Sequence, residues 1–340
     1  MGLIEQVLTF IGGGARAWPP PRLSLALQGG GSFGAFTAGV LDRLLDEPDV
    51  DVDAVSGASA GAVNAVLLAS GLIEGRAAAK ARLERFWKRM SQSTAFLPKA
   101  SLASLMSAAP FLHLLSLSPY QFNPFNLDPL RDALEAEIDF AELRAKAPMK
   151  LLIGATRVRD GKLRIFQAPE LTIEAVLASA CLPLIHHTVE IAGEPYWDGG
   201  YAANPPLIPL VHASDAAHLL VVQVTPTASE RLPKTPREIE RRLERIQFNA
   251  TLNAELEAIK LGIILRATPK MRRLRIGRIS AQDEFAGLEN ESPADLGREF
   301  LDRLWQSGRS AVETWLEQAG PLGRREGRSG VESWLWGGAS

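Results

Sequence analysis

One serine lies between two glycines, in a setting where a serine can act as a nucleophile. Ser59 is the centre of Gly57-Ala58-Ser59-Ala60-Gly61, with short apolar residues before it and a helical pattern from Ala60 to Leu72 after it. Where a strand turns sharply into a helix, the apical residue takes a positive φ. The residues two before and two after then crowd each other, so Gly57 and Gly61 suit both places. The pattern predicts a nucleophile elbow; a Gly/Ala-rich turn with an N-capping serine is the alternative.

A glycine cluster follows the first apolar run of the chain. Residues 23–28 are followed by Gly29-Gly30-Gly31-Ser32-Phe33-Gly34, and a helical pattern then runs from Ala35 to Leu45. Bare backbone N–H groups where a strand gives way to a helix form an anion site, which can hold a phosphate or the oxyanion of an acyl-transfer intermediate. We therefore predict an oxyanion hole formed by Gly29, Gly30, Gly31 and Gly34.

A carboxylate completes the set of reactive groups. Asp198 stands before Gly199 and Gly200, which let the backbone approach it closely, and Asn204-Pro205-Pro206 follows. Oxyanion donors, a nucleophile and a base thus occur in that order along the chain. A turn-forming Asp-Gly is the alternative role for Asp198.

These three segments resemble the signatures of the patatin-like phospholipases. The segment Ala178-Ser179-Ala180-Cys181-Leu182-Pro183 also resembles the one that precedes the family's aspartate. The resemblance covers about residues 23–210, and more loosely 235–319, where it is to one bacterial branch. One departure is Phe33, where many members carry Arg or Lys, so a phosphate-bearing lipid is less securely implied.

The resemblance implies an α/β fold: a three-layer α/β/α sandwich with a mostly parallel central sheet. It also implies a serine acyl hydrolase of phospholipase A or lipid acyl hydrolase type, with Ser59 as nucleophile and Asp198 as proton acceptor. No cofactor is expected. The expected substrate is a lipid ester at a membrane or micelle surface.

Two other functions compete with this interpretation. Gly29-x-Gly31-x-x-Gly34 also fits the dinucleotide-binding fingerprint, with Asp49, Asp51 and Asp53 near the place of a ribose-binding acid. However, such an acid should end the second strand, whereas these precede the strand-like Ala54-Val55-Ser56. A catalytically inactive lipid-binding module is the third class.

The histidines do not suggest a triad. Only His212 and His218 follow Asp198, as the Ser-Asp-His order requires, and both come before or at the start of the predicted strand 219–224. His186 and His187 precede Asp198 and are expected to be structural or to border the pocket, and His113 to be a core or lid residue. No cluster has metal-ligand spacing, so no metal is expected.

Composition restricts the function further. The chain of 340 residues has 37 basic and 39 acidic side chains, which gives no long-range attraction to nucleic acid or to an anionic membrane. Its single cysteine, Cys181, excludes an internal disulfide. No apolar stretch is long enough to span a membrane, and the N-terminus lacks the pattern of a signal peptide. We expect a cytoplasmic protein, peripheral at the inner membrane surface.

The chain divides into parts that must position these residues. A βαβα opening by residue 72 implies a parallel sheet. Thr172 and Thr235 are predicted helix caps, and Ser292-Pro293 is predicted to start a helical pair ending near Ala319. The predicted parts are an N-terminal helix and linker (1–22), a catalytic domain (23–225) with an apolar insertion or lid (92–127), a helical extension packed on it (226–319), and a disordered tail (320–340).

Overall fold

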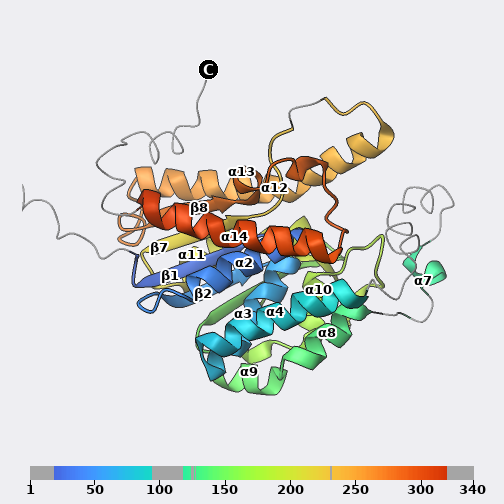
Figure 1. The fold of residues 1–340 in the computed structure, drawn as a ribbon, viewed down its shortest axis with the longest axis horizontal. Coiled ribbons are helices and arrows are strands. Elements are labelled where there is room, and N and C mark those ends of the chain that lie inside the picture. The colour runs from blue at the N-terminus through green and yellow to red at the C-terminus, as the bar shows by residue number, and fades with distance from the viewer. Residues whose placement is uncertain (1–18, 94–117, 124–125, 127, 230–231, 320–340) are drawn as a thin grey trace, which may run out of the picture.

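An eight-stranded sheet forms the centre of the molecule (Figure 1). This computed structural model describes residues 19–93, 118–123, 126, 128–229 and 232–319. Seven strands follow the order β5-β6-β3-β2-β1-β7-β8, and β4 pairs with β3. The strands are β1 (Arg22–Leu27), β2 (Asp51–Gly57), β3 (Lys150–Arg157), β4 (Leu163–Gln167), β5 (Val189–Ile191), β6 (Glu194–Asp198), β7 (His218–Gln223) and β8 (Arg275–Ser280).

Parallel pairing dominates this sheet. The strands β3, β2, β1, β7 and β8 are parallel to one another, whereas β4 and β6 pair antiparallel with β3, and β5 with β6. The predicted mostly parallel sheet is therefore confirmed. Strand β8 lies in the segment 226–319, so this segment adds a strand to the sheet as well as helices.

Helices cover both faces of the sheet, as the predicted three-layer arrangement requires. One face packs against α2, α3, α4, α8, α9, α10 and α14, and the other against α11 and α12. The helices are α2 (Gly34–Leu44), α3 (Ala60–Glu74), α4 (Arg76–Ser93), α7 (Pro119–Phe122), α8 (Pro129–Glu137), α9 (Phe140–Lys146), α10 (Ile173–Ser179), α11 (Leu207–Ala213), α12 (Pro236–Ile264), α13 (Ala281–Glu284) and α14 (Arg298–Ala319). Short 3₁₀ turns lie at η1 (Gly31–Phe33), η2 (Ala168–Glu170), η3 (Gly199–Tyr201) and η4 (Leu288–Asn290).

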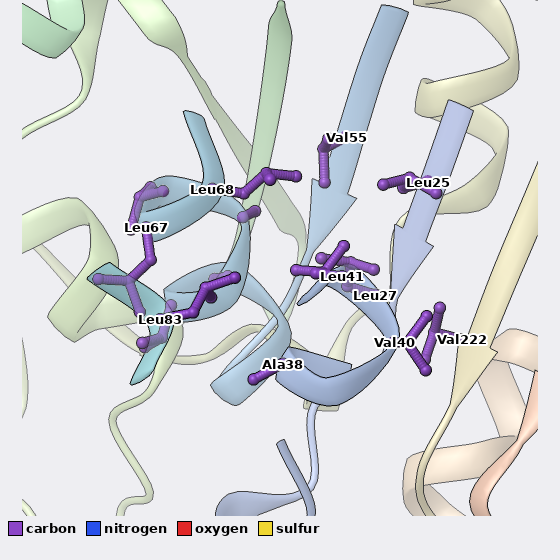
Figure 2. Packing of buried hydrophobic residues seen from close by; sticks show 14 of the residues in the cluster. Leu25, Leu27, Ala38, Val40, Leu41, Val55, Leu67, Leu68, Leu83 and Val222 are labelled. Carbon is purple, nitrogen blue, oxygen red and sulfur yellow. The ribbon is translucent and has the colours of Figure 1, made fainter. Parts of the chain in front are cut away.

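The strand sequences explain the two cores. Successive side chains of a strand point to opposite faces of the sheet. In β1, Leu25 and Leu27 therefore join the larger core, while Ala26 joins the smaller one under α11 and α12. Figure 2 shows Leu25, Leu27 and Val55 of the sheet facing helix residues such as Leu41 and Leu68. Burial on both faces holds the strand ends, and thus the loops after them, in place.

Local signals set most helix boundaries. Thr172 accepts a hydrogen bond from the Ala175 N–H, and Thr235 caps α12 in a reciprocal pair with Glu238. The predicted helix start at Ser292-Pro293 is wrong, because a single helix, α14, begins at Arg298. The reason is local: the Ser292 hydroxyl accepts from the Ala294 N–H, and Asp295 accepts from the Gly297 N–H. In these turns the backbone N–H groups of Ala294 and Gly297 donate to side chains, and the helix begins only after them.

Three predicted parts fall wholly or largely outside the described residues. They are the helix and linker at the N-terminus, most of the 92–127 insertion, and the tail from 320. Within the insertion, the structure describes the end of α4 and the short helix α7. Of the helices described, none combines the length and apolar character needed to cross a bilayer.

Candidate active site

Ser59 occupies the sharp junction between β2 and α3. Its φ is 54°, in the left-handed region, and α3 begins at the next residue. A Cβ on Gly57 would lie 2.5 Å from the carbonyl carbon of Gly61, and one on Gly61 would lie 2.0 Å from the Leu27 oxygen. Gly57 therefore has the steric cause expected from the sequence, whereas Gly61 is required by the backbone of the neighbouring strand β1. Ser59 itself is 7% exposed, at the N-terminal end of α3.

A second serine fixes the backbone of Ser59. The Ser59 N–H donates to the Ser179 carbonyl at 3.0 Å and to the Ser179 hydroxyl at 3.1 Å. That hydroxyl donates in turn to the Gly154 carbonyl in β3 at 2.6 Å. Ser179 ends α10, so this helix and β3 together hold the apex of the turn. Ser179 lies in the segment 178–183 that resembles the family, but nothing in the sequence indicated this role.

Asp198 ends β6 and lies beside the serine. Register pairs Asp198 with Ala155 of β3, while β3 pairs Ile153 with Gly57, so the carboxylate reaches the end of β2. A Cβ on the adjoining Gly199 would lie 3.1 Å from that of Ala58, the residue before Ser59. The side chain of Asp198 is fully buried, and its Oδ1 accepts from the Gly200 N–H at 2.7 Å.

Burial dominates the electrostatics of this carboxylate. It raises the pKa of Asp198 to about 7, while the Gly200 N–H and the Ser59 hydroxyl oppose part of the rise and the charge of Glu244 adds to it. Oδ2 accepts no hydrogen bond of ordinary geometry from the described residues, although Ser59 is near enough to influence the pKa. Asp198 thus has one free oxygen beside the serine hydroxyl and an affinity for protons near neutrality.

The glycine loop after β1 lies against the serine. A Cβ on Gly29 would lie 2.6 Å from the Ser59 Cβ. The Gly29 N–H donates to Asn204, and the Gly34 N–H donates within the 3₁₀ turn. The N–H groups of Gly30 and Gly31 have no acceptor within the described part of the chain. Of the four glycines predicted to form an oxyanion hole, these two therefore have N–H groups available.

Residues distant in sequence support this loop. Gly31 has a φ of 57°, and a Cβ there would lie 2.3 Å from the Pro293 oxygen. The same oxygen accepts from the Ser32 N–H at 2.8 Å. Arg245 of α12 donates to the carbonyls of Glu289 and Glu291, just before Pro293. The loop thus rests on the segment 289–293, which α12 holds.

Asn204 joins the glycine loop to the aspartate segment. Its Oδ1 accepts from the Gly29 N–H at 2.7 Å, and its Nδ2 donates to the Gly29 carbonyl at 3.3 Å and to Phe248 of α12 at 3.4 Å. Asn204 is fully buried. We missed this role from sequence; the only signal was the Asn-Pro-Pro run six residues after Asp198.

The histidines and the cysteine have other surroundings. His212 lies near the end of α11, and His218 starts β7 at the opposite end of the sheet from Ser59. The His187 ring lies 4.3 Å from that of Tyr120. Cys181 donates to the His187 carbonyl, and burial raises the pKa of its thiol to about 12. His113 is outside the described residues, and among those described no histidine hydrogen-bonds to an Asp198 side-chain oxygen.

The acids considered for ribose binding lie at the wrong end of the sheet. Asp51 starts β2, and Asp53 lies near the N-terminal end of this strand, whereas the glycine loop follows the C-terminal end of β1. Asp53 is buried beside Arg22 and accepts from the Ser214 hydroxyl at 2.7 Å and the Asp215 N–H at 2.6 Å. Burial would raise its pKa, but these partners lower the pKa below the usual range. The dinucleotide interpretation has no support in this arrangement.

Comparison with known proteins identifies the family. A family model described as patatin-like phospholipase matches residues 25–211, more than half of the chain, and the chain belongs to this family. No curated protein matches the sequence.

Among solved structures, VipD from Legionella pneumophila is 15% identical with a TM-score of 0.44; the match covers 89% of this chain and 69% of VipD. ExoU, in the ExoU-SpcU complex from the type III secretion system of Pseudomonas aeruginosa, is 18% identical with a TM-score of 0.37. That match covers 89% of this chain and 53% of the other, so this chain spans about half the length of ExoU.

Proposed function

We propose that this protein is a serine acyl hydrolase that cleaves carboxyl esters of lipids through a Ser59-Asp198 dyad. Membership in the patatin-like phospholipase family supports a lipid-hydrolysing enzyme. The observation that carries the finer proposal is the free Oδ2 of Asp198, fully buried beside Ser59 on a carboxyl group whose pKa is raised to about 7.

The first half of the reaction forms an acyl-enzyme. The Ser59 hydroxyl attacks the ester carbonyl and transfers its proton to Asp198, which gives a tetrahedral oxyanion. The free N–H groups of Gly30 and Gly31 stabilise that charge, and losing one such donor typically costs about 3 kcal/mol of transition-state stabilisation. The intermediate collapses, and the leaving alkoxide takes the proton from Asp198.

The second half restores the serine. Asp198, again a carboxylate, accepts a proton from the attacking water, and a second oxyanion forms in the same place. When it collapses, the proton returns to Ser59 Oγ and the fatty acid leaves. An ordinary carboxylate is too weak a base for a hydroxyl, but burial brings the pKa of Asp198 close to neutrality, where general bases work best.

Position 33 bears on the substrate. The Phe33 side chain is 2% exposed and packs edge-on against Phe300 of α14, with ring centroids 6.2 Å apart. It therefore points into the core, and this position supplies no cation for a lipid phosphate. We infer that ester recognition depends on the acyl and carbonyl groups, and that any head-group contact comes from elsewhere.

A fluorophosphonate probe tests the nucleophile. The probe forms a covalent adduct with an activated serine, and we expect labelling of Ser59 alone, found by peptide mapping. Ser59→Ala should abolish labelling and the hydrolysis of p-nitrophenyl butyrate together. Labelling that survives in Ser59→Ala would refute the assignment. A folded wild-type protein that neither reacts with the probe nor hydrolyses any ester would instead indicate the inactive lipid-binding module.

A further inference from the structure

The outer face of α12 carries a row of exposed aliphatic side chains, here called the outer stripe. At about 100° per residue along a helix, its members lie within about 60° of one another. They are Ile239 (44% exposed), Leu243 (61%), Ile246 (50%), Leu261 (56%) and Ile264 (64%). Leu265 (67%) lies at the edge of this row.

The stripe has no partner in the described structure. Leu252, Leu256 and Ile259 on the other side of α12 pack under the sheet, so the helix needs no further apolar face for its own burial. From Ile239 to Ile264 the stripe extends roughly 38 Å at 1.5 Å per residue. The aliphatic side chains form two groups on one line of the helix, within residues 239–246 and 261–265, and Ala250, Asn253 and Glu257 are exposed between them. Exposed apolar groups of this kind mark an interaction site, and their alignment suits a helix that lies in the plane of an interface.

Charge indicates what this surface binds. Residues 257–275, which include one end of the stripe and the turn after it, contain six basic residues and one acidic residue, a net charge of +5. The chain as a whole has a net charge of −2. Arg266, Arg272 and Arg273 in this stretch are exposed. Basic side chains next to an apolar helix face complement the anionic head groups of a phospholipid surface.

The N-terminal half of α12 borders the candidate active site. Phe248 packs against Gly200 and lies 5.4 Å from the Tyr201 ring, centroid to centroid. The charge of Glu244 contributes to the raised pKa of Asp198. Figure 1 shows α12 along one border of the molecule, with its N-terminal end projecting beyond the sheet. Phe248 and Glu244 lie on the opposite side of α12 from the stripe, so a surface that met the stripe would be separated from the candidate site by the width of this helix.

We propose that the outer stripe of α12 docks the protein on an anionic phospholipid surface, with the helix lying parallel to that surface. The aliphatic side chains enter the acyl boundary, and the basic stretch 257–275 contacts head groups. This inference rests on the proposed lipid substrate for its biological purpose, but its physical basis is the helix alone. Binding can therefore be measured without any hydrolysis.

Vesicle sedimentation with full-length Ser59→Ala tests the proposal, because this variant cannot consume the lipid. We expect binding to phosphatidylcholine vesicles that contain phosphatidylserine, and weaker binding to phosphatidylcholine alone. Leu243→Asp with Ile264→Asp should lower the partition coefficient at least ~10-fold. Arg272→Glu with Arg273→Glu should remove the preference for phosphatidylserine, and added salt should weaken wild-type binding in the same way.

Matched controls separate the stripe from general charge effects. Ser310→Asp adds a carboxylate at an exposed position of α14, which packs on the opposite face of the sheet from α12. Arg159→Glu with Lys162→Glu makes the same charge reversal on the β3–β4 turn. Both should bind vesicles as Ser59→Ala does. In an active background, Leu243→Asp with Ile264→Asp should hydrolyse soluble p-nitrophenyl butyrate within about twofold of wild type, which shows that the fold is intact.

Two outcomes would overturn the docking proposal. One is vesicle binding that the stripe substitutions leave unchanged. The other is a wild-type dimer, measured by analytical ultracentrifugation, that these substitutions dissociate, because the stripe would then bind a second copy. Failure of the proposed hydrolysis gives a different result: no ester is cleaved, while stripe-dependent vesicle binding remains.

Discussion

Two buried aspartates lie at opposite ends of the same sheet, in opposite electrostatic settings. Asp53, at the amino edge, accepts hydrogen bonds from Ser214 and the Asp215 N–H and pairs with Arg22, so its pKa falls. Asp198, at the candidate site, has one hydrogen bond, a free oxygen and a raised pKa. The partners of Asp53 stabilise its charged form. Asp198 is left largely without such partners, at a cost in stability, as expected for the carboxylate that we propose takes up a proton.

The largest expected effect comes from Asp198→Asn. Because the amide keeps the shape and removes the basicity, ester hydrolysis should fall by ~10³-fold or more, on the scale of losses at catalytic residues of serine hydrolases. Steady-state kinetics on p-nitrophenyl butyrate measure it. A folded variant with wild-type turnover would show that another residue is the base.

The same substitution should stabilise the protein at high pH. A folded pKa near 7, against 3.8 in the unfolded chain, means that the carboxyl group costs stability as pH rises from about 4 to 7. At about 1.4 kcal/mol per pH unit, Asp198→Asn should gain several kcal/mol at pH 8 and little at pH 4. Urea unfolding at the two pH values would show the difference, and equal gains at both would contradict the raised pKa.

Asp53→Asn should give the reverse result. Its carboxylate is stabilised in the fold, so we expect a loss of ~2–3 kcal/mol at pH 7, since Arg22 is partly exposed and recovers some solvation. Turnover should stay within about twofold. The lowered pKa also predicts that this contribution is present above about pH 4 and is lost as pH falls through the folded pKa. If Asp53→Asn abolished turnover without unfolding the chain, the division of roles between the two aspartates would fail.

The pH dependence of turnover provides the next test. Activity should rise with pH and level off above about 7, as Asp198 loses its proton. Such a midpoint also suits a histidine, so the midpoint alone does not identify the base. Temperature separates them, because the pKa of a carboxyl group changes little on warming and that of an imidazole falls. A midpoint that falls on warming would indicate histidine.

The smallest effects should come from the histidines. Replacing each of the five with Gln or Asn should cost about 1 kcal/mol of stability or less and reduce turnover less than tenfold. We expect the largest reductions at His186 and His187. The His187 carbonyl accepts from the Cys181 thiol, and the Cys181 carbonyl accepts from the Asp198 N–H. A well-folded His186, His187, His212 or His218 variant as inactive as Ser59→Ala would refute the dyad.

The parts of the site that could be predicted from the sequence are local. A side chain on Gly57 would meet the backbone of Gly61 four residues later, and the Thr235 cap lies three residues from its partner, so spacing alone carries the information. The partners of the loop are not local. Asn204 is 175 residues from Gly29, and Ser179 is 120 from Ser59. Only the strand order brings such pairs together.

Strand register also explains what the sequence could not say about the two aspartates. Both are acids near strand ends. The charge of Asp53 is stabilised because β1 brings Arg22 to it and the chain before β7 brings Ser214. The predicted oxyanion glycines could not be separated for the same reason. The Gly29 N–H is occupied because the side chain of Asn204, distant in sequence, accepts from it.

The support of the glycine loop by Pro293 has a practical consequence for dissecting this protein. The family match ends at residue 211, yet Ser32 and Gly31 rest on a carbonyl more than eighty residues later. A fragment ending at 211 would contain Ser59, Asp198 and every motif glycine. It would lack β7, so β1 would become an open edge strand prone to pairing with other chains. The smallest autonomous catalytic unit is therefore larger than its recognisable motifs, and expression boundaries should be drawn after α14.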